Sequence, residues 1–130
     1  MDRQTPHMLI VEDNSAMQRL LAEFLQLKTY TFDIAEDGVQ AFQQTLIRSY
    51  DLIFMDLQLP RMDGIDTIKA IRINLPFVPI IVITGVNDMR MIQRARDSGA
   101  DAYLPKPFAV IDLERLLQRL LPSAAPGKKQ

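Results

Sequence analysis

Short blocks of consecutive apolar residues alternate along the chain with longer stretches in which apolar residues recur every three or four positions. Three of the blocks are continuous and cover residues 8–11, 52–55 and 80–83. Such runs are typical of strands that are buried on both faces of a parallel sheet. Two weaker strands are predicted from the period-two alternation of Tyr30, Phe32 and Ile34 and from a short apolar segment at residues 102–104.

The stretches between these blocks have the period of amphipathic helices. In the first stretch, Asn14 or Ser15 can cap the helix start. The apolar stripe that follows consists of Met17, Leu20, Leu21, Phe24 and Leu25. Similar stripes predict four more helices. One begins after Asp37-Gly38, and a second stops before Pro76. A third runs from near Asn87-Asp88 to Gly99, and a fourth spans residues 113–121.

Strand and helix thus alternate five times, which predicts an α/β fold of the doubly wound type. Its parallel sheet should have right-handed crossovers and helices on both faces. A chain of 130 residues fits one domain, which we place at residues 1–122. Residues 123–130 are small, polar and interrupted by proline, so we interpret them as a flexible tail or the start of a linker.

Composition narrows the function classes. Fifteen basic residues against 16 acidic ones give a net charge of −1, without the basic excess that direct nucleic-acid binding normally needs. There is no cysteine, which excludes disulfides and is compatible with a reducing compartment. No apolar run is long enough to cross a bilayer, and the first residues do not resemble a signal peptide. We expect a cytoplasmic protein with no membrane partner.

Chemically reactive side chains follow the predicted strands. The first strand runs into Glu12-Asp13, the third into Asp56, the fourth into Thr84 and the fifth into Lys106. Because ligands of an open parallel sheet bind outside the carboxyl ends of its strands, these side chains should converge at one edge.

Three acids held together disfavour one another's ionisation, and a hard divalent cation relieves that cost. Mg²⁺ fits best, since zinc favours His or Cys and the chain has one His and no Cys. Glu12 and Asp13 would hold the metal. Asp56 is the best-placed nucleophile for phosphoryl transfer, with Lys106 and Thr84 facing the phosphoryl oxygens.

Together these segments resemble the receiver domains of two-component response regulators, similar to the chemotaxis regulators, from about Met8 to Leu121. The resemblance implies a flavodoxin-like sheet with strand order 2-1-3-4-5. It is carried by five motifs: residues 9–14 (LIVEDN), 51–56 (DLIFMD), 60–64 (PRMDG), 83–85 (ITG) and 99–108 (GADAYLPKPF).

The resemblance implies a role for each site residue. Asp56 would take a phosphoryl group from a phosphohistidine on a histidine kinase or a histidine phosphotransfer protein. The metal ligands would be Asp13, Asp56 and the backbone carbonyl of Gln58, with Glu12 acting mostly through water. The domain would assist its own phosphorylation and dephosphorylation as a signalling module rather than as an enzyme. The Lys106-Pro107 bond is expected to be cis.

Two further residues are implied as a switch. In the family the hydroxyl at Thr84 moves to the phosphoryl group and the aromatic at Tyr103 turns inward. This remodels the surface of the fourth helix, fifth strand and fifth helix, where a downstream protein reads the state. Homodimer formation stays open. Thr84 as a plain strand residue and Tyr103 as edge packing are the simpler alternatives.

Three other functions compete with this interpretation. An aspartyl phosphatase would usually carry a second Asp two residues after the nucleophile, where this chain has Gln58. A pseudo-receiver would be an interaction module that no longer takes phosphate. Nucleotide or flavin binding lacks its glycine-rich loop. His7, alone at the start of a strand, is interpreted as structural or solvated.

Overall fold

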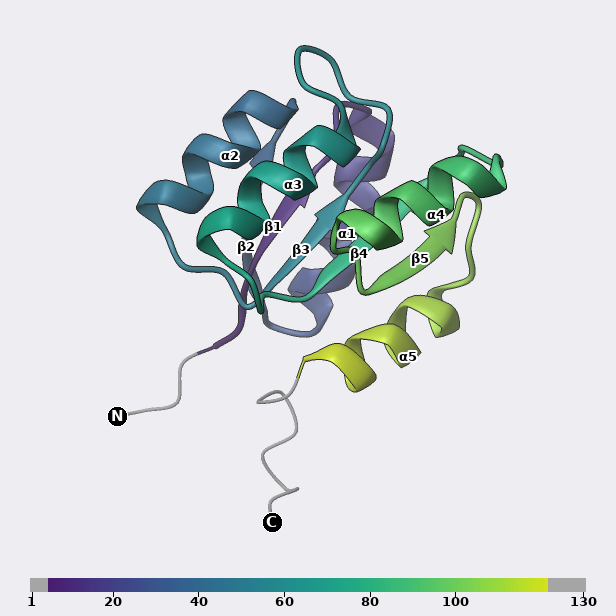
Figure 1. Cartoon of the computed structure of the whole chain (residues 1–130). Coiled ribbons are helices and arrows are strands. Elements are labelled where there is room, and N and C mark those ends of the chain that lie inside the picture. The colour runs from purple at the N-terminus through teal and green to yellow at the C-terminus, as the bar shows by residue number, and fades with distance from the viewer. Residues whose placement is uncertain (1–4, 122–130) are drawn as a thin grey trace.

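A computed structural model describes residues 5–121 of the chain. Within them strands and helices alternate as the sequence predicts (Figure 1). The domain boundary at residue 122 and the predicted tail 123–130 lie outside the described residues. The elements, in chain order, are β1 (His7–Val11), α1 (Ser15–Leu27), β2 (Thr31–Ala35), α2 (Gly38–Ile47), β3 (Leu52–Met55), α3 (Gly64–Asn74), β4 (Ile80–Thr84), α4 (Met89–Ser98), β5 (Ala102–Pro105) and α5 (Val110–Leu120).

The strands form one parallel sheet in the order β2-β1-β3-β4-β5. Its order reverses at β1, which pairs with β2 on one side and with β3 on the other. The predicted doubly wound α/β fold and the strand order 2-1-3-4-5 are confirmed. The reversal places the carboxyl ends of β1 and β3 next to each other, which is where such sheets bind ligands.

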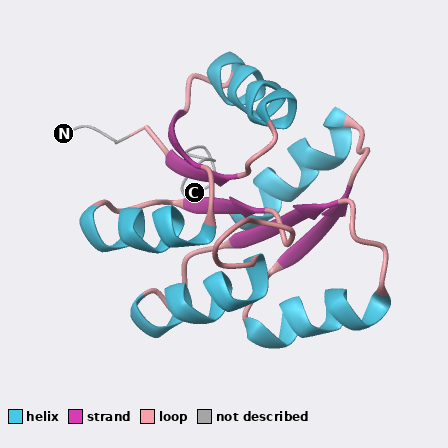
Figure 2. Cartoon of the chain, turned by 90° about the horizontal axis from the view of Figure 1, so that it is seen from above, coloured by secondary structure: helices cyan, strands magenta, loops and turns pink. Residues whose placement is uncertain are grey.

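Helices cover both faces of the sheet (Figures 1 and 2). Alternate strand residues point to opposite faces, so Leu9 and Val11 join the core under α2, α3 and α4, whereas Met8 and Ile10 join the core under α1 and α5. Both faces are therefore apolar, which explains why the inner strands read as continuous apolar blocks.

Four of the helices begin at a side-chain cap. Asn14, Asp37, Asp63 and Asp88 each accept a hydrogen bond from a backbone amide in the first turn of α1, α2, α3 and α4. The caps fix the helix starts close to where the sequence predicts them. At the other end of α4, Gly99 has a φ of 122°, a conformation that glycine adopts readily.

Some apolar residues of the amphipathic helices are exposed. Leu46 and Ile47 lie in the last turn of α2, Met89 is the first residue of α4, and Leu20 lies on the flank of α1. The period identifies one side of each helix, but it does not show how far the sheet beneath that side extends.

Candidate functional site

Three carboxylates meet where the strand order reverses. Glu12 and Asp13 directly follow β1, and Asp56 directly follows β3. Each offers an oxygen, and these oxygens lie within 4.8 Å of one another. Glu12 and Asp56 are buried, whereas Asp13 is exposed. The cluster is thus open to solvent on one side.

Lys106 brings a positive charge into this cluster. Its Nζ donates to Oε1 of Glu12 at 3.0 Å and to Oδ2 of Asp56 at 3.2 Å. The residue follows β5, and its backbone amide donates to the Thr84 carbonyl at 3.0 Å. The peptide bond to Pro107 is cis, as expected. An ammonium group so placed partly neutralises the two buried carboxylates.

The site changes the proton affinity of two of its members. Burial raises the pKa of the Glu12 carboxyl, the hydrogen bond from Lys106 opposes that shift, and the charge of Asp56 adds to it. Burial alone would lower the pKa of Lys106, but its hydrogen bond to Glu12 and the charges of Asp56 and Glu12 outweigh burial and raise it. Lys106 therefore stays protonated. One ammonium group does not balance the charge of three carboxylates, so a further cation could bind in the cluster.

Backbone groups of the loop that follows Asp56 hold this residue in place. The Gln58 amide donates to Oδ1 of Asp56 at 3.1 Å, so both carboxylate oxygens have donors. The Gly64 amide donates to the Leu57 carbonyl at 3.0 Å. A Cβ on Gly64 would overlap the Asp56 carbonyl and lie 2.6 Å from Cα of Leu57. Only glycine lets α3 start so close to the phosphoacceptor candidate.

Thr84 and Tyr103 both contact the loop after β4. Thr84 is fully buried at the end of β4, and its Oγ1 accepts a hydrogen bond from the Val86 amide at 3.3 Å. The Tyr103 hydroxyl donates to the Val86 carbonyl at 2.9 Å. Val86 is therefore shared by the two residues of the predicted switch.

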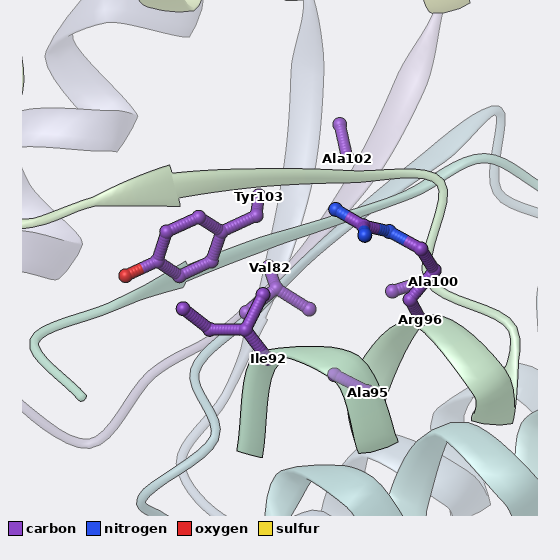
Figure 3. A pocket seen from close by; sticks show the side chains of 7 residues that line it. All are labelled: Val82, Ile92, Ala95, Arg96, Ala100, Ala102 and Tyr103. Atoms are coloured by element: carbon purple, nitrogen blue, oxygen red, sulfur yellow. The ribbon is translucent and has the colours of Figure 1, made fainter. Parts of the chain in front are cut away.

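The Tyr103 ring packs between β5 and α4 rather than into open solvent. It lines a cavity of about 10 Å³ with Val82, Ile92 and Arg96 (Figure 3). A cavity of this size holds about one water molecule. The structure thus has the ring close to the core under α4, with its hydroxyl tied to the loop.

The donor atoms of the cluster fit a hard cation. Glu12, Asp13 and Asp56 offer carboxylate oxygens alone, the ligand type that Mg²⁺ prefers, whereas a zinc site would include nitrogen or sulfur. These residues could hold Mg²⁺ with help from water and from a phosphate oxygen.

The predicted site residues converge, but the sequence does not reveal the groups that orient them. Glu12, Asp13, Asp56 and Lys106 come together, with Thr84 at the end of the adjacent strand β4. Two orienting donors were missed: the Gln58 amide on Asp56, and the Asn14 amide on Oε2 of Glu12 at 3.1 Å. Every residue except proline has a backbone amide, so no residue type signals this role.

None of the helices in the described part of the chain is both long and apolar enough to span a membrane.

Known proteins are similar to this chain in sequence and in fold. The response regulator receiver domain family matches residues 8–120. The transcriptional regulatory protein PdtaR of Mycobacterium tuberculosis is 40% identical over 106 residues, which cover 81% of this chain and 51% of PdtaR. The chain spans about half the length of the curated relatives it matches.

Two solved structures are similar over nearly their whole length. The receiver domain of the sensor histidine kinase PA1611 from Pseudomonas aeruginosa has a TM-score of 0.84 at 33% identity, covers 92% of this chain and 99% of its own, and has a magnesium ion coordinated in its active site cleft. The chemotaxis protein CheY4 of Vibrio cholerae has a TM-score of 0.84 at 29% identity, over 91% of this chain and 100% of its own. The fold, the motifs and the acidic cluster have one explanation: this chain belongs to the response regulator receiver domain family, a family of signalling domains.

Proposed function

We propose that this chain is a phosphorylation-driven switch in which Asp56 accepts a phosphoryl group from the phosphohistidine of a histidine kinase or histidine phosphotransfer protein. The observation that supports this most strongly is the position of Lys106, whose Nζ lies between Asp56 and Glu12 inside the acidic cluster. A surface lysine without a role would extend into water, whereas this side chain is only 22% exposed.

Asp56 acts as the nucleophile. One of its carboxylate oxygens forms the new bond to phosphorus, the bond between phosphorus and the donor imidazole nitrogen breaks, and the electron pair of that bond returns to the imidazole. Lys106 stays protonated and faces the phosphoryl oxygens, where its charge favours transfer. The Gln58 amide keeps the carboxylate in one orientation.

The metal site is proposed from the residues that surround Asp56. Mg²⁺ held by Asp13, Asp56 and the Gln58 carbonyl, with Glu12 acting mostly through water, would supply positive charge to the phosphoryl oxygens. The magnesium ion in the PA1611 receiver domain supports the choice of metal. Burial raises the pKa of Glu12, and a cation bound in the cluster would favour its charged form.

The proposed switch would involve Val86, because both Thr84 and Tyr103 bond its backbone. If Thr84 moves to donate its hydroxyl to the phosphoryl group, its hydrogen bond from the Val86 amide would change, while Tyr103 bonds the carbonyl of the same residue. Phosphorylation then favours one of two arrangements of this loop and of the adjoining surface of α4, β5 and α5. A downstream protein reads that surface, and a homodimer on it is an open alternative. The cytoplasmic location stays a prediction.

Intact mass spectrometry tests the proposal. The wild type, incubated with a small-molecule phosphodonor and Mg²⁺, should gain the mass of one phosphoryl group. The adduct should be lost in Asp56→Asn and in the wild type without divalent metal. A wild type that gains nothing would favour the pseudo-receiver, and continuous release of phosphate from a chromogenic ester would favour a phosphatase.

A further inference from the structure

The loop between β3 and α3 contains a turn that its own sequence does not favour. Arg61 has a φ of 68°, and the Met62 amide donates to the Pro60 carbonyl at 2.7 Å, which closes a γ-turn around Arg61. A residue with a side chain adopts this positive-φ turn only where its surroundings hold it. Asp63, directly after the turn, caps α3, so the turn has little freedom to relax.

Asp37, the N-cap of α2, supplies one contact that holds the turn. Nε of Arg61 lies 3.3 Å from Oδ2 of Asp37. Asp37 is itself fixed, since its Oδ1 accepts a hydrogen bond from the Gln40 amide at 2.8 Å and its side chain is only 11% exposed. The carboxylate is therefore an anchor, and the partly exposed Arg61 reaches back to it.

Backbone packing adds a second contact between the same segments. A Cβ on Gly38 would overlap the Met62 carbonyl and Oγ1 of Thr67. Thr67 in turn donates to the Asp63 carbonyl at 2.7 Å. Figure 1 shows the loop beside the start of α2, above the carboxyl edge of the sheet. The start of α2 and the turn are thus in direct contact.

The other end of the loop reaches the phosphoacceptor candidate. Gln58 lies three residues before Arg61, and its amide donates to Oδ1 of Asp56. In the proposed function, on which this step rests, the carbonyl of Gln58 is also a ligand of Mg²⁺. The turn at Arg61 and the two groups that would face the metal therefore lie in one short loop.

We propose that Arg61 and Asp37 are positioning residues for the metal site: their ion pair holds the γ-turn, and the turn holds Gln58 and the Asp56 carboxylate in place. The Arg61 side chain is 58% exposed, and exposed ion pairs contribute modestly. The expected effect on Mg²⁺ affinity is therefore about three- to fivefold. Helix α2, which contributes no metal ligand, becomes part of the machinery through this pair.

A double-mutant cycle on Mg²⁺ affinity, measured by isothermal titration calorimetry, tests the pair. Asp37→Asn keeps an oxygen for the helix cap and removes the charge. Arg61→Gln removes the other charge. Each variant should bind Mg²⁺ about three- to fivefold more weakly than the wild type, and the double variant should be no weaker than either. Arg90→Gln, which changes an arginine with a 92% exposed side chain on α4, is the control and should bind as the wild type does.

The two charges make the result diagnostic. If charge alone mattered, losing the Arg61 cation would strengthen Mg²⁺ binding while losing the Asp37 anion would weaken it. Tighter binding by Arg61→Gln, additive losses in the double variant, or unchanged affinity in both single variants would overturn the proposal.

Hydrogen exchange of the Gln58 amide, followed by NMR, gives a second readout that needs no metal. It should be faster in both single variants than in the wild type and in Arg90→Gln. Unchanged exchange would overturn the positioning role. A wild type that fails to bind Mg²⁺ would count against the proposed function, and the exchange rates would still decide whether the pair holds the loop.

Discussion

The Lys106 ammonium lies between two buried carboxylates, within hydrogen-bond distance of Glu12 and Asp56. In that place it offsets their mutual repulsion, but it also competes with any metal for the same oxygens. The contribution of Lys106 to phosphoryl transfer can therefore be measured separately from its effect on metal binding.

Replacing Lys106 by Met should therefore have opposite effects on two measurements. Mg²⁺ should bind at least as tightly as in the wild type, because a competing cation is gone. Phosphorylation by a small phosphodonor at saturating Mg²⁺ should slow by about a hundredfold or more, as when one charge-stabilising donor is removed from an active site. The rates come from intact-mass time courses. An unchanged rate would mean that Lys106 has only a structural role.

Gly64 offers a steric test beside Asp56. Gly64→Ala should destabilise the fold by about 1–3 kcal/mol, because its Cβ would overlap backbone atoms of Asp56 and Leu57. The matched control is Gly85→Ala, where a Cβ would meet nothing within 4 Å, and its change should stay within about 0.5 kcal/mol. Urea unfolding measures both. Equal stabilities would contradict the close approach of α3 to Asp56.

Asp33 on β2 gives a pH-dependent prediction far from the site. Burial acts to raise its pKa, but hydrogen bonds from Tyr50 and with His7, and the charges of His7 and Arg48, outweigh burial and lower it. A carboxyl group with a lowered pKa in the folded state stabilises the protein above its ordinary pKa of about 4 and loses that contribution as the pH falls through this range.

Asp33→Asn should thus cost about 1–3 kcal/mol at pH 7, and its difference from the wild type should shrink below about pH 4. Unfolding curves at a series of pH values would show this. A difference that stays constant with pH would contradict the assignment. His7 contacts Asp33 at 3.0 Å and stacks on Tyr50. These contacts agree with a structural role for this histidine.

At the scale of the elements, helix starts were predictable because capping chemistry is local. Asp37 illustrates this, since its Oδ1 accepts from the Gln40 amide at 2.8 Å and α2 begins directly after it, where the sequence predicts a helix start. The turn at Arg61 was not predictable. Its positive φ depends on contacts with α2, which is distant in the sequence, and nothing in the local sequence requires it.

The cap at Asp63 can be tested separately from its charge. Asp63→Ala should lower the free energy of unfolding by about 1 kcal/mol. Asp63→Asn keeps a capping oxygen and should lower it by at most about 0.3 kcal/mol. Chemical denaturation of both variants compares them. Equal losses in the two variants would show that the charge, and not the cap, stabilises the start of α3.

At the scale of the whole molecule, the alternation of apolar blocks and helical stripes was enough to predict the fold class, because both faces of the sheet are buried. It was not enough to predict the strand order. Alternation is equally compatible with other orders of a parallel sheet, so the order 2-1-3-4-5 rested on the resemblance and then on the observed pairing.

The site was predictable at the level of which side chains meet, since parallel strands bring their carboxyl ends to one edge. Glu12, Asp13, Asp56 and Lys106 were identified on that basis. The orientations of the Glu12 and Asp56 carboxylates were not predictable, because backbone amides at Asn14 and Gln58 set them.

The central claim is that the phosphoryl group is carried by Asp56. The most direct measurement is chemical trapping. The protein is phosphorylated in the presence of Mg²⁺ and reduced with borohydride, which converts an aspartyl phosphate to homoserine, and its peptides are then sequenced by mass spectrometry. Homoserine should be found at position 56 and only in samples that received both donor and metal. Homoserine at another aspartate, or a phosphoryl group retained on a serine, threonine or histidine, would contradict the account.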